Sequence, residues 1–145
     1  MEVDSAVKNQ EMAKVKINVD WDGNYGAAPA DEHIACVVTA KTFEELKREM
    51  AEALRLHIEW MKEEGDDIPA EFTGAYELDF ELTGRALVHC AETLVSRAAL
   101  SKASGINERQ LGHYSTGVSV PRPRQIERMR EGLRTIIAQL SVLSL

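Results

Sequence analysis

The sequence lacks long apolar runs and contains only two cysteines. No segment approaches the roughly 18 consecutive apolar residues of a membrane-spanning helix, and the N-terminus lacks the apolar core of a secretory signal. Cys36 and Cys90 lie far apart and form no C-x-x-C pair, so we expect two small buried thiols rather than a disulfide or a metal site. These absences predict a cytoplasmic protein with no membrane partner, metal or cofactor.

Basic residues are scarce as well, but only in the first part of the chain. The whole sequence has 17 Lys and Arg against 24 Asp and Glu, a net charge of −7. Residues 1–84 hold 20 acidic and 8 basic residues, a balance of −12, whereas residues 85–145 hold 4 and 9, a balance of +5. We therefore expect the C-terminal part to meet a polyanion, and the N-terminal part to stay solvated or to meet a basic partner.

The N-terminal part shows strand patterns. Residues 1–11 have no periodicity and are expected to form a disordered extension. Apolar and polar side chains alternate over residues 15–21, and the turn residues 22–24 predict a hairpin to a second strand over residues 25–28. Residues 33–40 predict a third, more fully buried strand.

A helix and a fourth strand complete this part. Thr42 and Glu45 have the spacing of a capping box, and apolar residues recur on one helical face until the helix stops near Gly65. Residues 76–82 alternate again, and their outward positions are all acidic: Glu77, Asp79 and Glu81. The order β-β-β-α-β predicts an α+β domain over residues 12–83. Three further side chains are assigned to its core, namely Trp21, His57 and Trp60.

Only helical patterns follow, so residues 84–145 are expected to form an all-α domain. Four helices are predicted, over residues 86–94, 97–104, 108–116 and 124–141. The middle two have helix-turn-helix spacing, in which Gly105 supplies the turn while Ser96 and Asn107 cap the helices. The residues expected to pack these helices together are Ala98, Leu100, Ala103, Ile106 and Leu111.

The third of these helices is the candidate for reading DNA. Glu108, Arg109 and His113 lie on its exposed face, and Arg109 suits bidentate donation to guanine O6 and N7. The caps Ser96 and Asn107 lie where they can also reach a phosphate. The alternative is an ordinary helical hairpin with solvated charges.

Two acidic features have competing interpretations. Asp20 and Asp22 have a spacing that suits a magnesium-dependent nuclease, although a tight turn also favours Asp before Gly, and no third carboxylate joins them. The acidic face of residues 77–81 is either simply solvated or an anionic patch that imitates phosphate for a basic RNA-binding partner.

From Met12 onward the sequence resembles the HicB family of antitoxins, found in bacterial type II toxin–antitoxin pairs. The segments that carry the resemblance are "VDWDGNYGAAPADE", "CVVTAKTFEELKREMAEALRLHIEWMKEEGDDIPAEF", "YELDFEL" and "SRAALSKASGINERQLGHYSTGVSVPRP". It implies a partial RNase H-like domain followed by a helix-turn-helix domain. It also implies DNA contacts at Ser96, Arg97, Asn107, Glu108, Arg109 and His113.

The resemblance also implies what the protein does. Members of the family bind and neutralise a small HicA toxin, a ribonuclease that cleaves messenger RNA, and they repress their own operon. We expect no enzymatic activity here, and we expect Glu77, Asp79 and Glu81 at the toxin interface. The apolar last helix and the tail "SVLSL" predict a homodimer or a higher homo-oligomer. A stand-alone regulator whose N-terminal domain senses a small ligand is the main rival.

Overall fold

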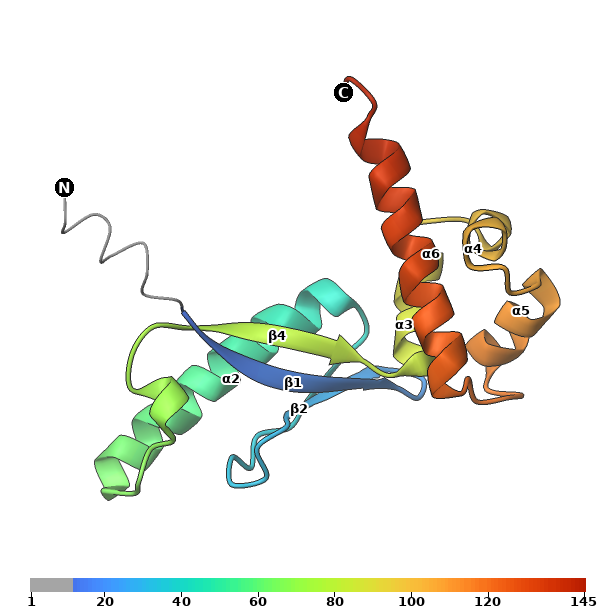
Figure 1. The fold of residues 1–145 in the computed structure, drawn as a ribbon. Coiled ribbons are helices and arrows are strands. Elements are labelled where there is room, and N and C mark those ends of the chain that lie inside the picture. Colours follow the sequence, from blue (N-terminus) through green and yellow to red (C-terminus); the bar gives the residue numbers. More distant parts are fainter. Residues whose placement is uncertain (1–11) are drawn as a thin grey trace. The chain divides into compact units, whose positions relative to one another are not determined.

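The computed structural model describes residues 12–145 and has an α+β fold, in which a four-stranded sheet and five helices account for most of the described chain (Figure 1). The chain forms two compact units; the first ends at Glu81 and the second spans Leu82–Leu145. The extension expected at residues 1–11 lies outside the described residues. Within residues 12–145, no helix is long and apolar enough to cross a bilayer.

The first two strands form the predicted antiparallel hairpin. β1 (Ala13–Trp21) buries Val15, Ile17 and Val19 on one face, and it pairs with β2 (Tyr25–Pro29). Gly23 in the connecting turn has a φ of 79°, in the left-handed region that glycine adopts without steric cost. The alternation in the sequence is therefore the alternation between the core and the open face of the sheet.

The third strand is shorter than the sequence predicts. β3 spans only Val38–Ala40, and it pairs antiparallel with β2. The preceding backbone turns instead of pairing: the Ile34 N–H donates to the Asp31 carbonyl, and the Cys36 N–H donates to the Ile34 carbonyl. The expectation of a more fully buried strand over residues 33–40 is wrong, because local turn hydrogen bonds hold its first half, and Val37 is 74% exposed.

The predicted helix is α2 (Phe43–Glu64). The Thr42 Oγ1 accepts a hydrogen bond from the Glu45 N–H at 3.2 Å, as expected for an N-cap. The helix ends at Gly65, whose φ of 76° reverses the chain. The face that α2 turns toward the sheet contributes five buried side chains to the core: Leu46, Met50, Leu54, Ile58 and Met61.

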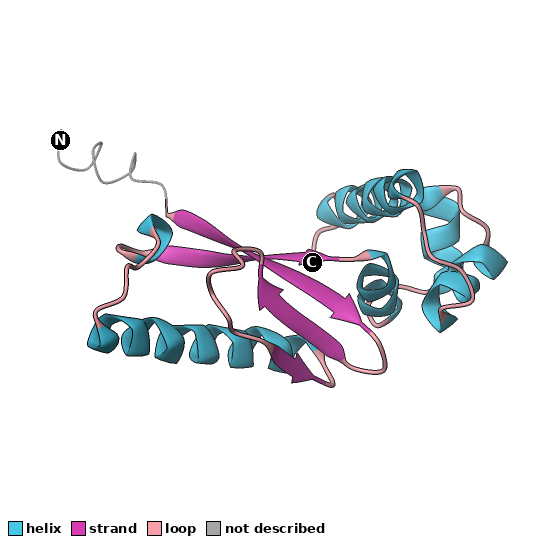
Figure 2. Cartoon of the chain, turned by 90° about the horizontal axis from the view of Figure 1, so that it is seen from below, coloured by secondary structure: helices cyan, strands magenta, loops and turns pink. Residues whose placement is uncertain are grey.

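The fourth strand lies at one edge of the sheet. A short 3-10 helix, η1 (Ala70–Phe72), leads into β4 (Tyr76–Leu82), and the strand order is β3-β2-β1-β4. Figure 1 shows β1 and β4 running in the same direction, and Figure 2 shows α2 lying along one face of the sheet.

The second unit is helical throughout. It contains α3 (Gly84–Glu92), α4 (Arg97–Ser104), α5 (Glu108–Thr116) and α6 (Pro123–Ser141). The predicted packing residues Leu100, Ile106 and Leu111 are buried, whereas Ala98 is exposed on α4 and does not belong to the interior. The remaining buried members of this core are Val88, Ala91, Tyr114 and Met129.

Three other expectations about burial need correction. Trp60 is 52% exposed because it lies outside the buried face of α2, where its ring contacts His57. Trp21 is only half-buried, with its ring edge-on to Tyr25 at 4.8 Å between centroids. Both cysteines are free thiols, but only Cys36 is buried; Cys90 is partly exposed. Burial raises the pKa of the Cys36 thiol.

A glycine allows α4 and α6 to approach each other closely. A Cβ atom at Gly132 would lie 2.9 Å from the Ser104 backbone nitrogen and 3.0 Å from the Ser104 Cα. Those neighbours are backbone atoms, which cannot swing aside as the end of a long side chain can. The close packing of α6 against the C-terminal end of α4 therefore depends on the missing side chain.

We predict that Gly132→Ala lowers the free energy of unfolding by about 1 to 3 kcal/mol, because overpacking outweighs the gain in helix propensity. Urea denaturation followed by far-UV circular dichroism measures the change. Gly112→Ala is the matched control, since a Cβ there meets the movable end of Arg97 at 3.0 Å rather than backbone. A Gly132→Ala protein as stable as the wild type would disprove the close packing.

Candidate functional site

The candidate site is built on α4, α5 and the turn that joins them. The Ser96 Oγ accepts from the Ala99 N–H at 3.0 Å, and the Asn107 Oδ1 accepts from the Gln110 N–H at 2.8 Å. Gly105 ends α4 with a φ of 75°. Both predicted caps are present, and in each the side-chain oxygen accepts the hydrogen bond.

The first turn of α5 presents charged side chains to solvent. Glu108 and Arg109 are exposed, and within residues 12–145 neither takes part in an ion pair. His113 lies one turn further along α5 and is half-buried. Arg109 is therefore the cation of α5 that is available to an incoming anion or base edge.

Arg97 is already engaged. Its Nε and Nη2 contact the Glu92 Oε1 at 2.8 and 2.7 Å, and the Ser115 Oγ donates to the other Glu92 oxygen at 2.9 Å. This network joins the end of α3 to the beginning of α4 and the last part of α5. A phosphate that binds Arg97 must share this side chain with Glu92 or displace Glu92 from it. Arg109 has no such competing carboxylate among the described residues.

Two arginines outside the predicted set lie beside the glycines that end the two helices. The Arg128 Nη2 of α6 donates to the Gly105 carbonyl at 2.7 Å, which fixes the turn between α4 and α5. At the end of α5, a Cβ on Gly117 would lie 3.0 Å from the Arg85 Nη2 of α3. Sequence patterns miss both arginines, because each lies far along the chain from its glycine and neither belongs to a local motif.

Two acidic side chains of β4 are exposed to solvent, and the third forms an ion pair with a lysine of β1. Glu77 and Asp79 are exposed on β4. Glu81 is partly exposed, and its Oε2 lies 2.5 Å from the Lys16 Nζ on β1. The three residues share one side of the strand, as the sequence predicts, but Lys16 compensates the charge of Glu81.

The two carboxylates of the nuclease hypothesis lie at the end of β1 and in the turn that follows it. Asp20 lies on the open face of β1, and Asp22 lies in the hairpin turn, where its N–H donates to the Asn24 carbonyl at 3.0 Å. Within the described part of the chain, no group of three or more His, Cys, Asp or Glu side chains is placed to hold a metal ion.

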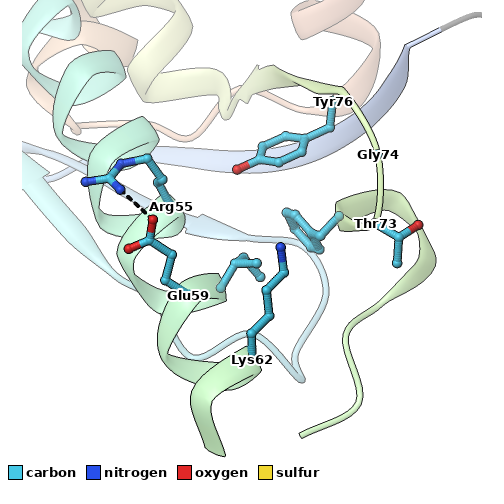
Figure 3. A pocket seen from close by; sticks show the side chains of 8 residues that line it. Arg55, Glu59, Lys62, Thr73, Gly74 and Tyr76 are labelled. Atoms are coloured by element: carbon cyan, nitrogen blue, oxygen red, sulfur yellow. Dashed lines mark hydrogen bonds and ion pairs between the residues drawn. The ribbon is translucent and has the colours of Figure 1, made fainter. Parts of the chain in front are cut away.

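A pocket of about 270 Å³ lies between α2 and the beginning of β4 (Figure 3). Ile58 and Phe72 are buried residues in its lining. The other lining residues are Arg55, Glu59, Lys62, Thr73, Gly74 and Tyr76. The pocket therefore combines apolar surface with a polar rim.

The charges at this rim are unequally neutralised. Arg55 lies between Glu52 and Glu59, with nitrogen–oxygen distances of 2.6 and 2.8 Å. The hydrogen bonds from Arg55 lower the pKa of Glu52, and the two carboxylates raise the pKa of Arg55. No described residue forms an ion pair with Lys62, which extends toward the pocket in Figure 3.

Comparisons of this chain with protein-family models, with curated proteins and with solved structures gave no match. The functional argument consequently depends on the residues and on their geometry.

Proposed function

We propose that this protein is a HicB-type antitoxin, which neutralises a basic HicA-type ribonuclease and represses its own operon. The observation that carries the proposal is the α4–α5 arrangement. Two capped helices meet at a left-handed glycine, and the second presents Arg109 from its exposed first turn. A helix that enters the major groove contacts base edges with such N-terminal residues.

The distribution of charge supports the same assignment. The helical part carries nine of the basic residues and four of the acidic ones, which suits a phosphate backbone. The β-β-β-α-β part carries the acidic excess, which suits a basic RNA-binding toxin. An acidic protein can thus bind DNA, because its negative charge belongs to the other unit.

A ligand-sensing regulator is the second candidate, and the pocket beside Phe72 favours it. The adjacent gene separates the two functions. Co-expression of this chain with a small basic protein encoded next to it should yield a complex if the chain is an antitoxin. A chain that purifies alone, and whose DNA binding responds to a small molecule, would favour the sensor.

The contribution of Arg109 to DNA binding gives the sharpest test of the repressor role. Arg109→Ala should weaken binding to the DNA upstream of the operon by about 1 to 3 kcal/mol, while binding of the toxin stays unchanged. Arg48→Ala is the matched control, because it removes an equal charge from an exposed position on α2. Both variants are compared by fluorescence anisotropy at one salt concentration. Equal DNA affinities of Arg109→Ala and wild type would exclude α5 as the recognition helix.

The proposal includes a homodimer formed through the end of α6. Ile126, Met129 and Leu133 pack into the core of their own unit. Further along, Ile137 is 62% exposed and Leu140 is 51% exposed, and they continue into the exposed apolar tail of Val142, Leu143 and Leu145. A second copy that covers this surface would form a two-fold symmetric dimer, and its two recognition helices would bind the half-sites of a pseudo-palindromic operator.

Ile137→Glu should therefore dissociate the dimer, because it places an unpaired charge in an apolar contact. Gln139→Glu adds the same charge to a neighbouring exposed position of α6 and should leave the dimer intact. Light scattering distinguishes a single 16.1 kDa chain from a dimer. A monomeric wild type at micromolar concentration, or a dimeric Ile137→Glu protein, would rule out this interface.

A further inference from the structure

The outer edge of β4 is the longest open backbone edge of the described sheet. The strand order places β1 on one side of β4 and no described strand on the other. β4 has seven residues and contains no proline, whereas β3 at the opposite edge has three. Backbone N–H and C=O groups that point outward from an edge strand are a template for another strand.

The two sides of β4 differ in character. Glu77 and Asp79 are exposed on the side away from α2. On the other side, Tyr76 and Phe80 make aromatic contacts with Phe72 and Phe43, with ring centroids 5.0 and 5.7 Å apart. A strand that lies next to β4 meets acidic side chains on one of its faces and apolar ones on the other.

The pocket extends the apolar side to the beginning of the strand. Its lining includes Tyr76 of β4 together with the buried Ile58 and Phe72 (Figure 3). Lys62 stands at the rim without an ion-pair partner among the described residues. A neutral apolar side chain suits this position, whereas a basic side chain is repelled by Lys62.

We propose that the outer edge of β4 binds an extended segment of a basic protein partner as an additional strand of the sheet. Basic side chains of that segment lie beside Glu77 and Asp79, and the alternating apolar side chains lie on the side of the pocket. Backbone hydrogen bonds supply the affinity, and the two faces of β4 select the alternating basic and apolar pattern.

Charge repulsion disfavours a second copy of this chain as the strand that pairs with the edge of β4. Antiparallel pairing of two β4 strands centred on Asp79 places that residue opposite its own copy. Like charges directly opposite each other destabilise a strand pair. The acidic side chains therefore disfavour pairing with a second copy of β4 and favour pairing with a basic segment.

A synthetic peptide tests the pattern directly. The probe has the length of β4, seven residues, and alternates lysine with valine. The control peptide has the same composition, with its lysines and valines in two separate blocks. Fluorescence anisotropy with the full chain should show at least about tenfold weaker binding of the control peptide. Equal binding of the two peptides would overturn the proposal, because unspecific charge attraction does not depend on their order.

Two measurements locate the peptide on the chain. Addition of the alternating peptide should shift the backbone amide NMR signals of residues 76–82. The double variant Glu77→Gln/Asp79→Asn should bind it about fivefold more weakly at low salt, since exposed opposite-charge pairs contribute modestly. The matched control, Glu63→Gln/Asp66→Asn, removes two exposed charges outside the sheet and should bind normally. Shifts confined to other segments, or equal losses in both double variants, would contradict the edge site.

The inference deepens the proposed antitoxin function, because the basic partner it needs is the toxin. Different results would nevertheless contradict the edge site and the antitoxin function. A complex with the toxin in which the amide signals of residues 76–82 do not move would overturn the edge site and leave the antitoxin role intact. Selective binding of the alternating peptide, without any binding of a neighbouring basic protein, would support the edge site and count against the antitoxin role.

Discussion

The position of α5 depends on the left-handed turn at Gly105. A side chain there would strain the backbone, and its Cβ atom would lie 2.9 Å from the Arg128 guanidinium. Both the turn and the hydrogen bond from Arg128 therefore favour glycine at this position. Gly132 brings α6 close to Ser104, immediately before the turn. Because α6 holds the turn and also carries the apolar surface proposed for dimerisation, the proposed dimer would orient both recognition helices through the same element.

The separation of charge determines what each unit can bind. The helical unit exposes Arg109 from a capped helix, whereas the sheet exposes Glu77 and Asp79 from an edge strand. In the proposed function, electrostatic attraction favours a polyanion at the first surface and a polycation at the second.

Local patterns in the sequence predict most of the secondary structure. Alternation identifies the strands around Ile17 and Leu78, and capping chemistry identifies the helix starts at Thr42, Ser96 and Asn107. These features are predictable because each depends on residues within one turn or one strand of each other. The same local patterns place Glu108 and Arg109 at the exposed beginning of α5.

Features that depend on distant contacts are not predictable in this way. The shortened β3 follows from turns at Asp31, and the exposure of Trp60 follows from which face of α2 meets the sheet. The Arg128–Gly105 hydrogen bond joins residues that no motif connects. The edge position of β4 becomes apparent only from the strand order.

Hydrogen–deuterium exchange of the full chain, with and without DNA from upstream of its own operon, tests the two-surface account most directly. The account predicts that DNA slows backbone exchange within residues 96–117 and leaves residues 76–81 unchanged. Slowed exchange in β4, with none in α4 and α5, would contradict it, because the acidic sheet would then be the surface that meets DNA.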